Sequence, residues 1–252
     1  MKFEESFVQS ADGTQIQCLK SGVGKPIILL HGLQRSAGIW FDLLSCLPLQ
    51  RQFILPNLRG RGKSGIPLDM QSYRLERFVD DLEAVVQSLE MPVAVLGWSM
   101  GASVAWAFSR RPCAARVSHW IFVSGTPDPT NTRVLFKNGS YEQLAAQVHS
   151  RVNSQAGHEV CETHAAVAAW LGFRDADFLQ DPPKLTVPRL MIHGDQDHDC
   201  PIDAAIRLAR LIDSELIVFE GAQHNPMKAD PARFAQVLTR FLEGELDEPD
   251  AF

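Results

Sequence analysis

The sequence predicts an α/β fold, in which a mostly parallel β-sheet carries helices on both of its faces. Two observations lead to this prediction. Short, continuously apolar runs of strand length alternate with stretches of helical periodicity, and the alternation occurs in the N-terminal half and again at the end of the chain. The 252 residues, 45% of them hydrophobic, are enough to build a large buried core.

Eight segments are expected to form strands. Asp12-Gly13 predicts a hairpin turn between the first two. The unbroken apolar run at residues 27–30 is typical of a strand that is buried on both faces. In chain order, the segments are residues 3–9, 14–19, 27–30, 52–55, 92–96, 117–123, 189–193 and 215–219.

Helices are expected between these strands. The clearest covers residues 75–89, where apolar positions 75, 78, 79, 82, 85, 86 and 89 follow a helical period. The others cover residues 36–47, a small-residue stretch that follows Gly101 and reaches about Arg110, and residues 202–211 and 231–242.

Residues 126–187 interrupt the alternation. Prolines stand near both ends of this segment, and alanine-rich helical patterns cover residues 141–152 and 159–171. We therefore expect a small helical cap inserted into a core formed by residues 1–125 and 188–252. The large apolar side chains of the cap should mostly pack it onto the core, with one or two lining a pocket: Leu135, Phe136, Tyr141, Trp170, Phe173 and Phe178.

Charge and composition argue against several classes of protein. Lys and Arg number 24 against 30 Asp and Glu, and a net charge of −6 disfavours binding to nucleic acid through its phosphates. No apolar run approaches the ~18 residues of a membrane span. The five cysteines are odd in number and include no C-x-x-C pair, and the acidic N-terminal residues do not resemble a signal peptide. These features favour reduced thiols and a cytoplasmic location.

The strongest chemical signal lies at residues 97–101, which read G-W-S-M-G between an apolar strand and a helix. In that context, G-x-S-x-G predicts a sharp turn that lifts the hydroxyl of Ser99 above the sheet. The helix N-terminus that follows favours negative charge at this position. Ser99 is thus a candidate nucleophile, and a plain glycine turn with a capping serine is the alternative.

A serine hydroxyl needs a base to become nucleophilic. His224 is the candidate because it follows the last strand, at the same edge of the sheet as Ser99. A carboxylate should orient the imidazole, and Asp195, Asp197 and Asp199 all follow the preceding strand. The chain order Ser–Asp–His agrees with this kind of sheet. Three acids so close together could instead suggest a metal loop, but the glycine spacing of a calcium site is missing.

His31-Gly32-Leu33 directly follows the strand expected at residues 27–30. Backbone N–H groups in this loop can face Ser99 and, together with the N–H of Met100, form an oxyanion hole. His31 itself is expected to be structural and to bond to the backbone of the loop.

Five motifs in order make the chain resemble the α/β-hydrolase fold family over nearly its whole length. They are H-G-x at 31–33, R-G-x-G-x-S at 59–64, G-x-S-x-G at 97–101, G-x-x-D-x-x-x-P at 194–201 and G-x-x-H at 221–224. The resemblance implies an eight-stranded sheet and makes Asp197 the acid, with Asp195 as the alternative. It also implies that the N–H groups of Leu33 and Met100 hold the oxyanion. Two departures, Asn57 before the arginine motif and Ala102 after the serine motif, leave the subfamily open.

The serine motif and the short cap are similar to those of microbial carboxylesterases, and Trp98, beside the serine, is expected to bind substrate. One such group cleaves the methyl ester of pimeloyl carried on acyl carrier protein, and grips the acidic carrier with arginines of the cap. Here, residues 129–152 hold Arg133, Lys137 and Arg151 against one acidic residue, whereas residues 153–188 hold two basic residues against five acidic ones. A carrier-protein partner is therefore a hypothesis for a cap whose charge is split.

The sequence predicts a serine hydrolase that cleaves a small to medium carboxylic ester through an acyl-enzyme, with no metal or organic cofactor. Hydrolysis of a lactone, a thioester or a C–C bond, and perhydrolysis, stay open on the same triad. A receptor or regulator that binds a small molecule and turns over slowly is the alternative from another class.

Overall fold

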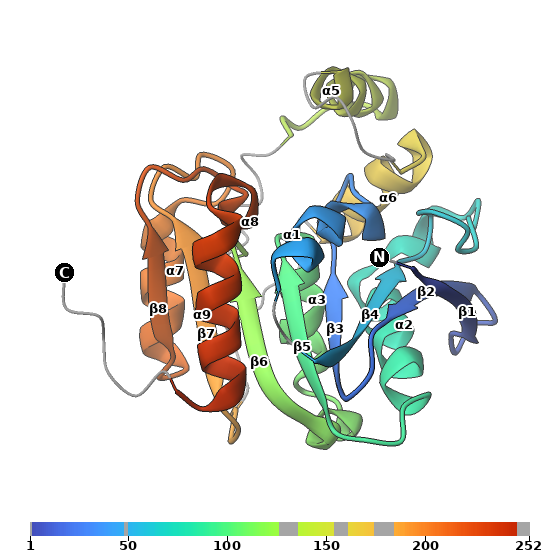
Figure 1. Cartoon of the computed structure of the whole chain (residues 1–252). Coiled ribbons are helices and arrows are strands. Elements are labelled where there is room, and N and C mark those ends of the chain that lie inside the picture. Colours follow the sequence, from blue (N-terminus) through green and yellow to red (C-terminus); the bar gives the residue numbers. More distant parts are fainter. Residues whose placement is uncertain (1, 48–49, 126–135, 154–160, 174–183, 246–252) are drawn as a thin grey trace.

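The computed structural model of the chain describes residues 2–47, 50–125, 136–153, 161–173 and 184–245. Eight strands form one sheet (Figure 1). They are β1 (Glu4–Gln9), β2 (Gln15–Ser21), β3 (Lys25–Leu30), β4 (Arg51–Asn57), β5 (Val93–Trp98), β6 (Val117–Val123), β7 (Arg189–Gly194) and β8 (Glu215–Phe219).

The strands are hydrogen-bonded in the order β1-β2-β4-β3-β5-β6-β7-β8. The pairs β1/β2 and β2/β4 are antiparallel, and every pair from β4/β3 to β7/β8 is parallel. This confirms the predicted eight-stranded, mostly parallel sheet. Because parallel strands end at the same edge, the loops after β3, β5, β7 and β8 lie near one another, and that edge is where ligands bind in sheets of this kind.

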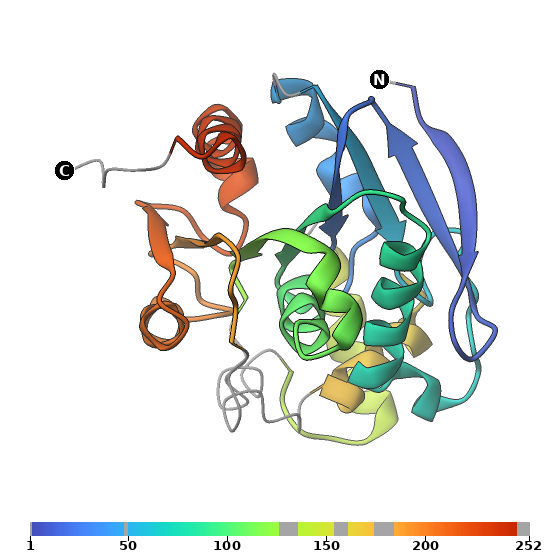
Figure 2. The ribbon, with the colours of Figure 1, turned by 90° about the horizontal axis from the view of Figure 1, so that it is seen from below.

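Helices cover both faces of the sheet (Figure 2). One face carries α2 (Leu75–Gln87), α3 (Met100–Phe108) and α7 (Ile202–Leu211), and the other carries α1 (Phe41–Cys46), α8 (Pro226–Ala229) and α9 (Pro231–Glu243). Three short 3₁₀ segments are η1 (Ala37–Trp40), η2 (Met70–Tyr73) and η3 (Pro112–Arg116). The helix expected at residues 36–47 is present as the 3₁₀ segment η1 followed directly by α1. At the start of η1, the side chain of Ser36 accepts the N–H of Gly38.

The apolar side chains of the strands alternate between two cores. In β5, Val93 and Val95 pack in the core that contains α2, α3 and α7, whereas Ala94 and Leu96 pack in the core that contains α1 and α9. All four side chains are fully buried. Burial on both faces explains why β5 is a continuous apolar run in the sequence.

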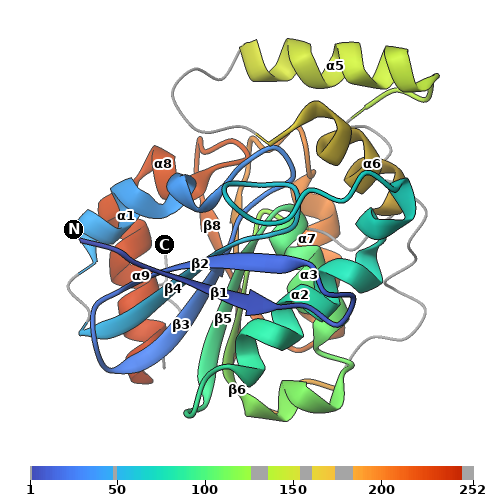
Figure 3. The ribbon, with the colours of Figure 1, turned by 90° about the vertical axis from the view of Figure 1, so that its right-hand side faces the viewer.

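Two further helices, α5 (Tyr141–Asn153) and α6 (Thr163–Phe173), lie above the carboxyl edge of the parallel strands, with α6 nearer to the sheet (Figure 3). The helix expected at residues 141–152 is present as α5. The helix expected at 159–171 is present as α6, which begins only at Thr163 and continues to Phe173; residues 161 and 162 are not helical, and 159 and 160 lie outside the described part. Because 126–135, 154–160 and 174–183 are also outside it, a cap bounded by 126–187 stays a prediction. None of the described helices is long and apolar enough to cross a membrane.

A buried arginine joins the antiparallel end of the sheet to α2. The Arg59 side chain is fully buried, and its guanidinium donates to both carboxylate oxygens of Asp81, at 2.9 and 2.6 Å, and to Asp12 at 2.7 Å. Burial acts to raise the pKa of Asp12, but hydrogen bonds and charge from Arg59 hold this pKa below its ordinary value. Positive φ angles at Gly60 and Gly62 turn the chain sharply after Arg59. The R-G-x-G-x-S motif at 59–64 is therefore a structural feature of the fold.

Replacing Asp81 with Asn should lower the free energy of unfolding by about 3 kcal/mol or more, because it leaves a buried guanidinium without its full countercharge. Urea unfolding at pH 7 measures the change. Asp80→Asn is the matched control: Asp80 pairs with the exposed side chains of Arg77 and Arg111, and the loss of its charge should lower the free energy of unfolding by no more than about 1 kcal/mol. Equal effects of the two substitutions would contradict a special role for the buried pair.

Candidate active site

Ser99 occupies a sharp turn between the end of β5 and the start of α3. Its backbone angles are φ 55° and ψ −119°, a conformation that residues other than glycine rarely adopt. The two glycines of the motif make this turn sterically possible. A Cβ on Gly97 would lie 2.3 Å from the carbonyl oxygen of Gly101, and a Cβ on Gly101 would lie 2.5 Å from that of Leu30. The turn therefore requires glycine at both positions.

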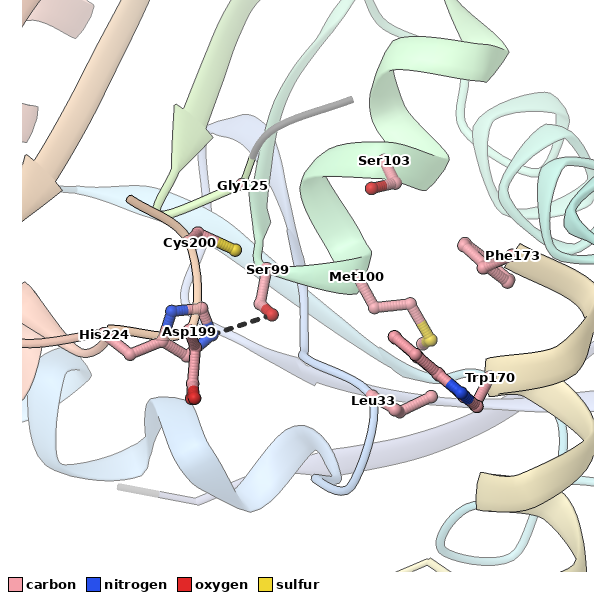
Figure 4. Close-up of a pocket in the computed structure, with 10 residues that line it drawn as sticks. All are labelled: Leu33, Ser99, Met100, Ser103, Gly125, Trp170, Phe173, Asp199, Cys200 and His224. Carbon is pink, nitrogen blue, oxygen red and sulfur yellow. Dashed lines mark hydrogen bonds between the residues drawn. The ribbon is translucent and has the colours of Figure 1, made fainter. Parts of the chain in front are cut away.

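His224 lies against the hydroxyl of Ser99. It is carried by the loop between β8 and α8, and its Nε2 is 2.9 Å from Ser99 Oγ (Figure 4). The indole N–H of Trp98 donates to the carbonyl oxygen of His224 at 2.7 Å, and the two rings are 5.4 Å apart. Trp98 thus fixes the backbone of the histidine loop from the strand that precedes Ser99.

Asp197 completes a chain of hydrogen bonds. His224 Nδ1 is 2.8 Å from Asp197 Oδ2, and Asp197 Oδ1 accepts the N–H groups of Asp199 and Cys200, each at 2.9 Å. An ionised carboxylate can only accept, so Nδ1 carries the proton and Nε2 presents its lone pair to the hydroxyl of Ser99. In this arrangement the imidazole is oriented to remove the serine proton.

The other two aspartates of this loop have different partners. Asp195 accepts the N–H of Gly221 at 2.7 Å, and Asp199 forms an ion pair with Arg151. Among the three, only Asp197 bonds to His224 in the described structure. The described residues also contain no group of three side chains that could hold a metal ion.

His193 is a neighbour of Asp197 that sequence reasoning did not single out. It is the penultimate residue of β7 and is fully buried. Its Nε2 is 2.7 Å from the carbonyl oxygen of Cys200 and 3.4 Å from Asp197 Oδ2. Burial lowers the pKa of His193, so the ring is neutral and donates its N–H to the loop. The only sequence signal for this contact was a histidine at the end of the strand that leads into the acid.

The loop after β3 presents Leu33 beside Ser99. His31 accepts the N–H of Leu58 at 3.1 Å and has Nδ1 2.8 Å from the carbonyl oxygen of Gly32. Burial, and then the charge of Arg61, lower the pKa of His31 to about 3, so that it stays neutral. His31 therefore bonds to backbone in its loop, as expected.

Leu33 and Met100 are the residues expected to supply the oxyanion donors. Both line the cavity that contains Ser99. Arg61 donates to the carbonyl oxygen of Leu33 at 2.6 Å and so fixes the loop from behind. Two backbone donors next to a serine hydroxyl are what stabilisation of an oxyanion requires.

A small cavity of about 60 Å³ opens beside Ser99. Figure 4 shows Ser99 and His224 on one side and Trp170 and Phe173, both from α6, on the other. The remaining lining residues are Leu33, Met100, Ser103, Gly125, Asp199 and Cys200.

Among the described residues of the expected cap, Trp170 and Phe173 are the aromatic ones that line the cavity. Phe136 is instead buried and Tyr141 is exposed, whereas Leu135 and Phe178 lie outside the described residues. Trp98 does not line this cavity and is 5% exposed. A contact between Trp98 and substrate stays a prediction, which this buried position does not favour.

Most of the chain resembles known proteins in sequence and in fold. The sequence model of a family described as "Alpha/beta hydrolase family" matches residues 27–237. The chain is 25% identical to the AB hydrolase superfamily protein YisY of Bacillus subtilis, over 87% of this chain and 92% of that protein. It is also 25% identical to the non-heme chloroperoxidase CPO-A1 of Kitasatospora aureofaciens, over 92% of this chain and 97% of that protein. An esterase from Exiguobacterium antarcticum has a similar fold, with a TM-score of 0.79, 23% identity, and coverage of 95% of this chain and all of that one.

Substitution of the acids should separate Asp197 from Asp195. With a fluorophosphonate that reacts with activated serines, Asp197→Asn should slow labelling of Ser99 by about a hundredfold or more, because the imidazole then loses its correct tautomer. Asp195→Asn keeps a side-chain oxygen that can accept the N–H of Gly221, and it should change the rate by no more than about threefold. Labelling rates from intact-protein mass spectrometry measure both effects, and the reverse ranking would assign the acid to Asp195.

Proposed function

This chain belongs to the alpha/beta hydrolase family, and from this premise we propose that it is a serine hydrolase that cleaves carboxylic esters. In the proposal, Ser99 is the nucleophile, His224 the base and Asp197 the acid. The observation that carries it is the continuous hydrogen-bonded chain from Ser99 Oγ through both ring nitrogens of His224 to the Asp197 carboxylate. Esterase-like structural neighbours support the class of reaction.

In the first half of the reaction, His224 Nε2 takes the proton of Ser99 as Oγ attacks the ester carbonyl. Asp197 stabilises the imidazolium that forms and holds its orientation. The carbonyl oxygen becomes negative, and the N–H groups of Leu33 and Met100 stabilise that charge. The tetrahedral intermediate then collapses, His224 gives its proton to the leaving alcohol, and the acyl group stays on Ser99.

In the second half, His224 removes a proton from water, which attacks the acyl carbonyl. The same two N–H groups stabilise the second oxyanion, and collapse releases the acid and restores the Ser99 hydroxyl with the proton held by His224. Each step uses only groups that lie within the site described above. The reaction as proposed needs no metal or organic cofactor.

The size and lining of the cavity support a small substrate group. A volume of about 60 Å³ is a few times the roughly 10–15 Å³ needed to hold one water molecule. Leu33, Met100, Trp170 and Phe173 make most of its wall apolar, which favours a short acyl or alkyl group over a charged one. We propose an ester with a short chain on the side that enters this cavity.

Other reactions use the same groups and differ in the substrate or in the second nucleophile. Lactones, thioesters and C–C bonds stay open on this triad, as does slow turnover by a small-molecule receptor. Perhydrolysis has one specific observation in its favour, since a relative carries the name non-heme chloroperoxidase. Hydrogen peroxide attacking the acyl-enzyme in place of water would give a peracid, so peracid formation in an ester assay with added peroxide distinguishes the two reactions.

The carrier-protein hypothesis rests on basic residues of the segment above the sheet. Arg133 lies outside the described residues, and Arg151 is engaged by Asp199. Lys137 is exposed. The acyl carrier protein therefore stays a prediction, which saturable binding to the purified carrier would test.

The proposal is tested with p-nitrophenyl esters from acetyl to dodecanoyl, hydrolysed by the wild type and by Ser99→Ala. The wild type should turn over the short chains fastest, and Ser99→Ala should lose about a thousandfold or more in kcat. Circular dichroism of the variant checks that its fold is intact. Full activity in a pure, folded Ser99→Ala protein would refute the proposal, and slow turnover by the wild type on every ester would favour a narrower chemistry or the receptor.

A further inference from the structure

Helix α5 is fixed above the site by its own buried face. Leu144 and Val148 are each 1% exposed and belong to the core that contains α2 and α3. The side-chain amide of Gln34, the residue after Leu33, donates to the carbonyl oxygen of Val148 at 3.0 Å. One side of the helix is therefore attached to the loop that would hold the oxyanion.

The far end of α5 reaches the loop that carries the acid. Arg151 donates from both terminal nitrogens to the two carboxylate oxygens of Asp199, at 3.1 and 2.6 Å. The two side chains are 29% and 24% exposed, so the pair is only partly screened by solvent. A bidentate pair of this kind fixes the relative orientation of the two side chains as well as the distance between them.

Asp199 connects this ion pair to the catalytic groups in two ways. Its backbone N–H donates to Asp197 Oδ1 at 2.9 Å, and its carboxylate lines the same cavity as His224. Burial acts to raise the pKa of Asp199, but hydrogen bonds to Arg151 and the charges of His224 and Arg151 hold it below the ordinary value. At neutral pH, Asp199 is therefore a second carboxylate in the cavity that contains His224, and Arg151 balances its charge.

We propose that Arg151 is a positioning residue that neutralises Asp199 and holds its loop in place, so that Asp197 alone acts on His224. The inference rests on the proposed function of the same site. Without Arg151, the Asp199 carboxylate would stand uncompensated beside His224 and favour the protonated imidazole, which cannot act as a base. Without Asp199, the positive charge of Arg151 would disfavour that protonated form.

Other groups lie near this base or near the ion pair, and one of them is Arg35, whose pKa is lowered by burial and then by the charge of Arg151. Asp197 bonds to His224 directly, and His193 approaches from β7 as a neutral ring. His198, in the same loop as Asp199, is exposed and acts on the Asp199 carboxylate. Cys200 adds a thiol to the cavity wall. Arg151 and Asp199 are thus the pair whose charges can be changed while the triad is left intact.

The test is the pH dependence of two rates, kcat/KM for p-nitrophenyl acetate and fluorophosphonate labelling of Ser99, for the wild type, Arg151→Met, Asp199→Asn and the double variant. Arg151→Met should move the acidic limb of both profiles to higher pH by about half a unit to one unit. Asp199→Asn should move it to lower pH. In the double variant, where neither charge remains, the limb should return to within about 0.2 unit of the wild type.

Lys137→Met is the control for net charge, since it removes a positive charge from the same part of the chain and should leave both profiles unchanged. Circular dichroism and thermal melting report folding, and if Arg151→Met fails to fold, the downward shift in Asp199→Asn carries the test. An acidic limb that does not move in the folded variants would overturn the inference. An upward shift that persists when Asp199 is already Asn would also overturn it, since altered packing of α5 would then be the cause.

Failure of the proposed function has a different signature. In that case Ser99→Ala would retain activity, or the fluorophosphonate would not label Ser99 in the wild type. If Ser99 is labelled and required, but the Arg151 and Asp199 variants show wild-type profiles, only the positioning role of Arg151 is refuted.

Discussion

The backbone turn at Ser99 is the constraint on which the rest of the site depends. A φ of 55° is unfavourable for serine, at a cost of roughly 1–3 kcal/mol. The packing and hydrogen bonds around Ser99 hold its backbone in this conformation. β5 is paired on both sides by β3 and β6, and the Ser99 N–H donates to the carbonyl oxygen of Val123 at 2.9 Å. The strain is therefore held by the centre of the sheet, and it aims the hydroxyl at the edge where the other loops end.

Two of the loops at that edge are fixed by buried polar side chains. His31 and Arg61 hold the loop that contains Leu33, and His193 holds the loop that contains Asp197. Burial keeps both histidines neutral by lowering the pKa of each ring. They can therefore form hydrogen bonds next to the proposed catalytic groups without adding charge there.

Central strands such as β3 and β5 could be predicted because they are buried on both faces and are continuous apolar runs in the sequence. The more exposed β1 and β2 were predicted from the Asp12-Gly13 turn between them. The serine turn could be predicted because its glycines have a local steric reason. The choice between Asp195 and Asp197 depended on family resemblance, since both follow β7 and nothing local distinguishes them. The contact between Arg151 and Asp199 joins residues 48 positions apart, and that between Trp98 and His224 joins residues 126 apart. Such contacts depend on how the loops and helices pack against one another in the folded chain, and local sequence periodicity does not predict that packing.

The measurement that tests the central claim most directly is the identity of the covalent intermediate. The wild type is mixed with p-nitrophenyl acetate, quenched with acid within the first turnover, digested and examined by peptide mass spectrometry. The account predicts an acetyl group on the peptide that contains Ser99, assigned to that residue by fragmentation and absent after a long incubation. Rapid release of p-nitrophenol with the acetyl group on another residue, or with none on the protein at any time, would contradict it.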